Sequence, residues 1–136
     1  MTTTLMLRIA SLISFVFAVA HSLGGPSKWS PMGDNDVLKA MANTRFDIMG
    51  FNRSYLDLYL GLGWSISIAM LLQTIVLWQM ASLARANAAQ VRPMIAAFAL
   101  ATIASGTVAW FFIFAIPALF AAALLVALVA AYLAPR

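Results

Sequence analysis

Four long stretches of apolar residues alternate with short polar segments along the chain. They cover approximately residues 5–23, 55–83, 93–114 and 117–133. About 20 apolar residues in a helix cross the hydrocarbon core of a bilayer, so each stretch predicts one membrane-spanning helix. No charged side chain occurs from Pro93 to Pro135, which is long enough for two such helices. The pattern predicts an all-α, integral membrane four-helix bundle formed by a single domain, residues 1–136.

Glycine and proline predict where these helices begin and end. Gly24, Gly25 and Pro26 are expected to end the first helix, since glycine suits a helix C-terminus and proline cannot continue it. Pro93 and Pro117 are each expected at the first position of a helix. The third and fourth helices then form a tight antiparallel hairpin.

The first apolar stretch has a second interpretation. Arg8, the apolar run and the small residues Ala18-Val19-Ala20 resemble a secretory signal peptide with its cleavage site. Apolar residues also precede Arg8, which favours a helix that stays in the protein.

The polar loop of residues 25–54 contains all of the aspartates except Asp57. Asp34-Asn35-Asp36 predicts the start of a short amphipathic helix, because these residue types cap helix N-termini. Val37, Leu38 and Met41 would form its apolar side, and we expect it to lie along the membrane interface.

Composition narrows the functional classes. The chain has no cysteine, which excludes thiol redox chemistry and thiolate metal sites. One histidine and four acidic residues are too few for an ordinary zinc or di-iron site, so we expect no metal and no cofactor. The net charge of +4 is not clustered, which indicates anionic lipid headgroups rather than nucleic acid. The alanine-rich last helices are compatible with a homo-oligomer.

Charge predicts the orientation only weakly. With the N-terminus inside, four basic residues lie on each side of the membrane, which is a tie under the positive-inside rule. The aspartates of the 25–54 loop break the tie. We therefore expect both termini in the cytoplasm of a bacterial cell, with the protein in the inner membrane and the polar loop facing the periplasm.

Small and polar residues form a stripe on the first helix: Ser11, Ser14, Ala18, His21 and Ser22. Such a stripe usually lets a neighbouring helix approach closely. His21, at the end of the helix, either meets interfacial water or caps a carbonyl, or else serves as a proton-relay or ligand-binding group.

The start of the second helix also has two interpretations. Ser54 and Asp57 have the spacing of a capping box, which explains Asp57 without any further role. Alternatively, Arg53, Asp57, Gly61 and Trp64 share one helical face and form a niche, with Gly61 removing bulk beside Asp57. The candidate ligand-binding residues are His21, Arg45, Asp47, Arg53, Asp57, Tyr59 and Trp64.

Two segments carry a family resemblance. The first is Phe46-Asp47-Ile48-Met49-Gly50, and the second runs Arg-Ser-Tyr-x-Asp-x-Tyr-x-Gly-x-Gly from Arg53 to Gly63. Together with the histidine and glycines that close the first helix, they resemble an uncharacterised family of small bacterial four-helix membrane proteins. The resemblance implies an architecture and no established activity.

Three functional hypotheses follow. The first is a non-enzymatic protein that binds an apolar or amphipathic ligand, or a membrane-protein partner, at the outer end of the bundle. The second is a membrane enzyme for a lipid-soluble substrate, with His21 and Asp57 as an acid–base pair. The third is a proton-coupled transporter, whose polar path would depend on Gln73 and on a few serines and threonines.

Overall fold

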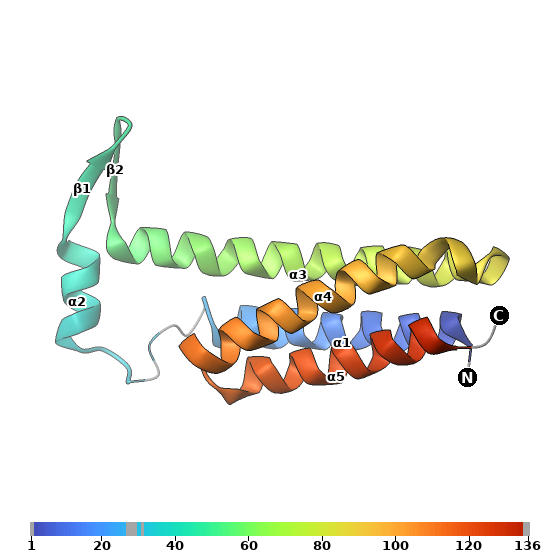
Figure 1. The fold of residues 1–136 in the computed structure, drawn as a ribbon. Coiled ribbons are helices and arrows are strands. Elements are labelled where there is room, and N and C mark those ends of the chain that lie inside the picture. Colours follow the sequence, from blue (N-terminus) through green and yellow to red (C-terminus); the bar gives the residue numbers. More distant parts are fainter. Residues whose placement is uncertain (1, 27–29, 31, 135–136) are drawn as a thin grey trace. The chain divides into compact units, whose positions relative to one another are not determined.

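The computed structural model describes residues 2–26, 30 and 32–134. This part of the chain contains five helices and one two-stranded antiparallel sheet (Figure 1). The elements are α1 Thr3–Gly24, α2 Asp36–Asn43, β1 Arg45–Ile48, β2 Phe51–Ser54, α3 Tyr55–Ala86, α4 Ala88–Phe112 and α5 Ala115–Leu133. The long helices confirm the predicted all-α fold, and α2 is the short helix expected in the first loop. Pro135 and Arg136 lie outside the described residues.

Four of the helices, α1, α3, α4 and α5, are long and apolar enough to cross a membrane. At about 1.5 Å per residue, α3 is longer than a hydrocarbon core of about 30 Å requires. A protein with this set of helices has the composition of a membrane protein.

The chain divides into two compact units, each described here by itself. The bundle unit consists of Met1–Phe17 and Met70–Arg136, and the hairpin unit consists of Ala18–Ala69. Both α1 and α3 contribute residues to each unit. That the chain forms one domain stays a prediction.

The bundle unit has an apolar core made by all four long helices. Leu7, Leu77, Ile95 and Leu128 are fully buried and come from α1, α3, α4 and α5 respectively. The remaining core side chains are mainly alanines and methionines: Met6, Ala10, Met80, Ala81, Ala84, Ala127 and Ala131. Alanine lets helix backbones approach closely, which is how helices associate when lipid removes the hydrophobic difference between interior and surface.

Serine and threonine side chains join α1 to α3 in this unit. Ser11 Oγ donates a hydrogen bond to the Thr74 carbonyl at 2.8 Å, and Thr74 Oγ1 donates to Ser14 Oγ at 3.1 Å. Ser11 and Ser14 are both buried. This part of the polar stripe on the first helix therefore serves helix packing.

The α4 helix begins five residues earlier than predicted. Its N-cap is Asn87, whose side chain accepts a hydrogen bond from the Ala89 amide at 3.0 Å, and Pro93 lies inside the helix. Placing Pro93 at the first helical position was wrong because the asparagine supplies the cap that proline was expected to replace. Only Asn87 separates α3 from α4.

The α4–α5 hairpin is as tight as predicted, with Ile113 and Phe114 between the helices. Pro117 is not the first residue of α5 but lies in its first turn, where backbone amides have no intrahelical acceptor. Gly106 faces Ala121 so closely that a Cβ built on the glycine would lie 3.0 Å from the alanine Cβ.

In the hairpin unit, the end of α1 approaches α3. The Gly25 amide donates to the His21 carbonyl at 2.7 Å, and a Cβ on Gly25 would lie 2.7 Å from the same oxygen. Pro26 is buried, and a Cβ added to Gly63 of α3 would lie 3.3 Å from the Pro26 Cβ. The predicted stop at Gly24-Gly25-Pro26 thus also creates a close contact with α3.

The α2 helix begins as the Asp34-Asn35-Asp36 sequence predicts. Asn35 is the N-cap, and its side chain accepts a hydrogen bond from the Leu38 amide at 3.0 Å. Leu38 and Met41 are partly buried, whereas Val37 is exposed. Val37 therefore does not belong to the apolar side predicted for this helix.

Candidate functional site

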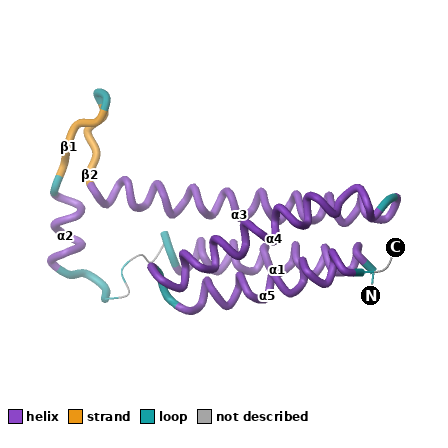
Figure 2. The backbone as a smooth tube through the Cα atoms, viewed as in Figure 1, coloured by secondary structure: helices purple, strands orange, loops and turns teal. Residues whose placement is uncertain are grey.

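A β-hairpin that the sequence analysis did not predict lies between α2 and α3 (Figure 2). Arg45, Phe46, Asp47 and Ile48 pair with Ser54, Arg53, Asn52 and Phe51 in that order. Met49 and Gly50 form the two-residue turn, with φ angles of 50° and 85°. Positive φ at both central residues is the pattern of a type I′ turn, which matches the twist of paired strands.

The hairpin has two chemically different faces because successive strand residues point to opposite sides. The hairpin polar face consists of Arg45, Asp47, Asn52 and Ser54. The hairpin apolar face consists of Phe46, Ile48 and Phe51, and Arg53 completes that side.

The hairpin polar face is linked by its own hydrogen bonds, which meet at Asn52. Arg45 Nε donates to Asn52 Oδ1, and Arg45 Nη2 donates to the Asn52 carbonyl at 3.2 Å. Asn52 Nδ2 donates to Asp47 Oδ1 at 3.2 Å across the strand pair. These bonds hold together a short hairpin that would be marginal in isolation.

Asp57 joins the polar face to the start of α3. The Ser54 amide donates to Asp57 Oδ2 at 2.8 Å, and the Asp57 amide donates to Ser54 Oγ at 3.1 Å. This reciprocal pair is the capping box predicted from sequence. Arg45 Nη2 lies 3.8 Å from Asp57 Oδ2, an ion pair that is about half exposed. Asp57 therefore organises the junction between β2 and α3.

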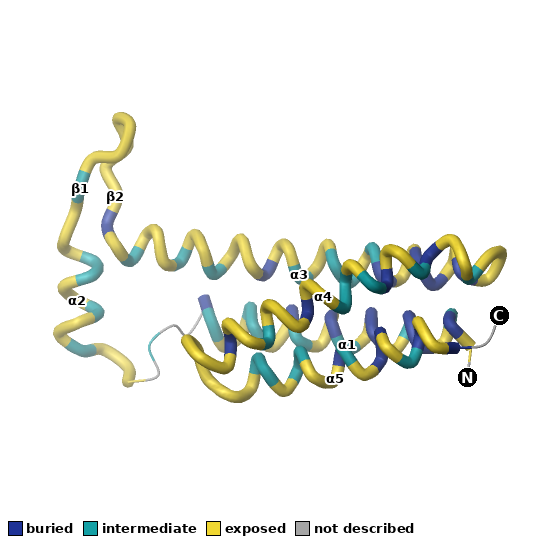
Figure 3. Tube along the Cα trace, in the orientation of Figure 1, coloured by how far each residue is buried: buried dark blue, intermediate teal, exposed yellow. Residues whose placement is uncertain are grey.

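The hairpin apolar face leaves large side chains uncovered. The exposed fractions are 96% for Met49, 62% for Phe51 and 43% for Ile48. Figure 3 shows exposed residues along most of both strands. Phe46 is the exception, since its ring packs on Tyr55 with centroids 4.9 Å apart. The turn therefore presents three uncovered apolar side chains together.

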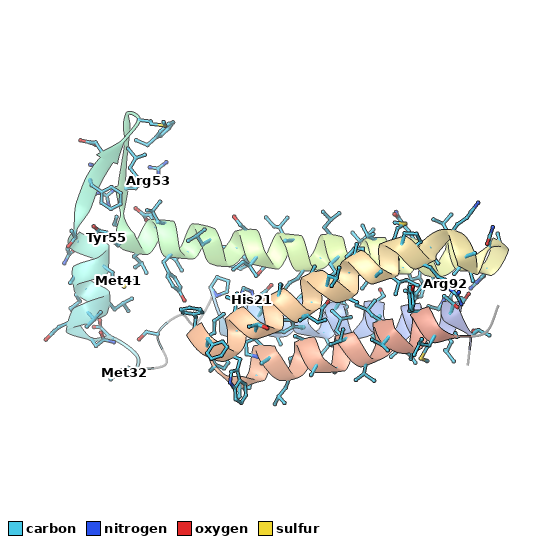
Figure 4. All side chains as sticks on the ribbon, viewed as in Figure 1. His21, Met32, Met41, Arg53, Tyr55 and Arg92 are labelled. Carbon is cyan, nitrogen blue, oxygen red and sulfur yellow. The ribbon has the colours of Figure 1, made fainter. Side chains whose placement is uncertain are left out.

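His21 lies on α1 and is bonded to a different part of α3 (Figure 4). Its Nδ1 is 2.9 Å from Ser67 Oγ, which donates to the Gly63 carbonyl at 3.4 Å. Ser67 and Asp57 are ten residues apart on α3, or about 15 Å along the helix axis. The structure does not bring His21 and Asp57 within the hydrogen-bond reach that an acid–base pair requires.

The niche predicted along one face of the second helix does not form as expected. Arg53 belongs to β2 rather than to the helix, and its guanidinium carbon lies 5.4 Å from the centroid of the Phe51 ring. A Cβ added to Gly61 would meet nothing within 4 Å, so this glycine makes no room for a neighbour. Tyr59 and Trp64 are exposed on α3.

Of the seven candidate binding residues, the structure brings Arg45, Asp47 and Asp57 together. The sequence analysis missed Asn52, which connects them, and Ser67, the partner of His21. A signal for the hairpin was present, because polar and apolar residues alternate from Arg45 to Ile48 and the Met49-Gly50 turn follows.

The hydroxyl groups considered for a transport path mostly bond to their own helices. Thr102 donates to the Phe98 carbonyl at 2.7 Å, and Thr107 donates to the Ile103 carbonyl at 2.9 Å. Threonines that bond back in this way are satisfied without a path. Within the described residues, no group of three or more His, Cys, Asp or Glu side chains could hold a metal ion.

Comparison of the chain with protein-family models, with curated proteins and with solved structures finds no match. The resemblance to small bacterial four-helix proteins therefore stays a prediction.

Proposed function

We propose that this chain is a small, non-enzymatic membrane protein of the bacterial inner membrane that binds a membrane-protein partner through the hairpin of Arg45–Ser54. The observation that carries the proposal is the division of the hairpin into two faces. Its polar groups bond to one another, and Ile48, Met49 and Phe51 stay uncovered. Contiguous exposed apolar side chains typically mark an interaction site.

The shape of this surface favours a macromolecular partner over a small ligand. Small-molecule sites are concave and enclose most of the ligand. The uncovered side chains instead lie at and beside a two-residue turn, which is a convex feature. The strands also have unpaired backbone edges, to which a strand of another protein can add.

Catalysis is not supported by the placement of the titratable groups. His21 is bonded to Ser67, and Asp57 is bonded to Ser54 and Arg45. The resemblance to small bacterial four-helix proteins supports the inner membrane, and the aspartates of the 25–54 loop support cytoplasmic termini.

Site-specific cross-linking tests the proposal, because a chain without cysteine accepts a single labelled cysteine at any chosen position. Met49→Cys would carry a photo-activated cross-linker in native membranes, and the exposed Asn43→Cys on α2 is the matched control. We expect an adduct of one defined mass from position 49, a much weaker one from position 43, and loss of the adduct when Phe51→Asp is added.

Two results would contradict this function. Cross-linking to lipid alone would assign the apolar side chains to the bilayer. Equal adducts from positions 43 and 49 would mean that the hairpin has no special role. An adduct of twice the chain's own mass would identify the partner as a second copy, in agreement with the predicted homo-oligomer.

A further inference from the structure

The bundle unit contains only basic charged residues. Its sequence segments hold Arg8, Arg85, Arg92 and Arg136 and no acidic residue, whereas the hairpin unit balances four basic residues with four aspartates. The whole formal charge of +4 therefore resides in the bundle unit. No aspartate of its own is present to neutralise these arginines, so an anionic partner has to come from outside the unit.

Arg8 is the arginine with the fewest partners. Its Nε atom is buried and has no hydrogen-bond acceptor among the described residues. Its guanidinium carbon lies 4.6 Å from the centroid of the Trp78 ring. A guanidinium stacked on an aromatic ring keeps its donors in one plane, and that planar fork matches a phosphate group. The unsatisfied donor thus indicates a missing acceptor.

Arg92 forms a similar pair with an aromatic residue in the same unit (Figure 4). Its guanidinium carbon lies 5.8 Å from the centroid of the Tyr132 ring, and Nη2 donates to the Ala134 carbonyl at 3.1 Å. Tryptophan and tyrosine are enriched at the depth of lipid headgroups. Both arginine–aromatic pairs are therefore suited to the level at which lipid phosphates lie.

An apolar groove begins at the same tryptophan. It has a volume of about 360 Å³ and is lined by α1 and α3 residues, namely Ser11, Leu12, Phe15, Thr74, Ile75, Trp78 and Gln79. Leu12 and Phe15 follow Arg8 by one and two turns of α1, so the groove extends about 10 Å along the helix from the arginine. A cation at one end of an apolar groove is complementary to an anionic amphipath.

We propose that the bundle unit binds an anionic phospholipid, with the headgroup phosphate at Arg8 against Trp78 and an acyl chain in the groove between α1 and α3. Basic sites between helices are a known mode of headgroup recognition. This site is independent of the hairpin and of any partner bound there.

The test measures lipid binding to the intact chain in detergent micelles. The bundle-unit tryptophan Trp78 is kept, and Trp29, Trp64 and Trp110 are replaced by phenylalanine, so that its fluorescence reports the groove. The probes are phosphatidylglycerol and phosphatidylcholine with brominated acyl chains, which quench a nearby tryptophan. We expect phosphatidylglycerol to quench at a concentration about fivefold to tenfold lower than phosphatidylcholine.

Two variants separate the headgroup site from general charge. Arg8→Gln should abolish the preference for phosphatidylglycerol, and Arg85→Gln, at an exposed position, should retain most of it. The thermal midpoint of Arg8→Gln without lipid should not fall, because the substitution removes a buried donor that has no acceptor. Arg8→Lys should keep only part of the preference, since lysine lacks the planar fork.

Three results would overturn the proposal. Equal quenching by the two lipids would remove the charge recognition. A preference that survives Arg8→Gln would place it elsewhere. Competition by inorganic phosphate as effective as that by phosphatidylglycerol would show an anion site that does not use the groove.

Discussion

Met49 occupies a backbone conformation that suits its neighbour Gly50 better than itself. A positive φ costs an ordinary L-residue about 1–2 kcal/mol, and asparagine tolerates it well. Met49→Asn should therefore stabilise the hairpin by about 1 kcal/mol, which would be measured as slower amide exchange in β1 and β2. The same change should weaken partner cross-linking from Phe51→Cys, because it removes the most exposed apolar side chain.

The opposite directions of these two effects make the prediction specific. Met49→Leu is the control, since it keeps both the apolar side chain and the strained turn. If Met49→Asn left exchange unchanged, the turn would not carry the strain that its φ angle indicates.

Ser54 stabilises the first turn of α3 through its side chain. Ser54→Ala removes the acceptor of the Asp57 amide, which should cost about 1 kcal/mol and speed exchange of that amide. Ser54→Thr retains a hydroxyl and should behave nearly as the parent chain does. A loss of the same size in both variants would mean that packing around the buried serine, rather than the cap, accounts for the effect.

At the scale of elements, the two glycines near the start of α3 have different roles. Gly63→Leu should displace Pro26, because even a Cβ there lies 3.3 Å from the proline. Gly61→Ala meets no neighbour and should stabilise the helix by about 0.5–1 kcal/mol. Thermal unfolding in detergent would compare them, with a lower midpoint for Gly63→Leu and an equal or higher one for Gly61→Ala. Equal losses would contradict the close contact.

Apolar length predicted the four long helices, because that signal extends over many residues. Helix starts were less predictable, since a single cap decides them. Asn87 moved the start of α4 ahead of Pro93, although proline was the more conspicuous residue. The hairpin strands have four residues each, too short for their alternation to stand out beside the long apolar runs.

At the scale of the whole molecule, the candidate site was predictable only in part. The Ser54–Asp57 capping box depends on residues three apart, and sequence alone revealed it. The partners of Arg45 depend on strand register, which brings Asn52 opposite Asp47. The separation of His21 from Asp57 depends on where α1 ends against α3, which requires the contact of Pro26 with Gly63.

The distribution of charge leads to a prediction about orientation. The positive-inside rule favours the arginines of the bundle unit in the cytoplasm, and α3 alone separates the 25–54 loop from Asn87. Asn43→Cys should react with a membrane-impermeant maleimide added to intact spheroplasts, whereas Asn87→Cys should react only after the membrane is opened. Val108→Cys in α4 is the control and should stay unlabelled in both conditions, because a lipid-facing thiol does not ionise readily. Labelling of positions 43 and 87 from the same side would mean that α3 does not cross the bilayer, and the reverse pattern would place the hairpin in the cytoplasm.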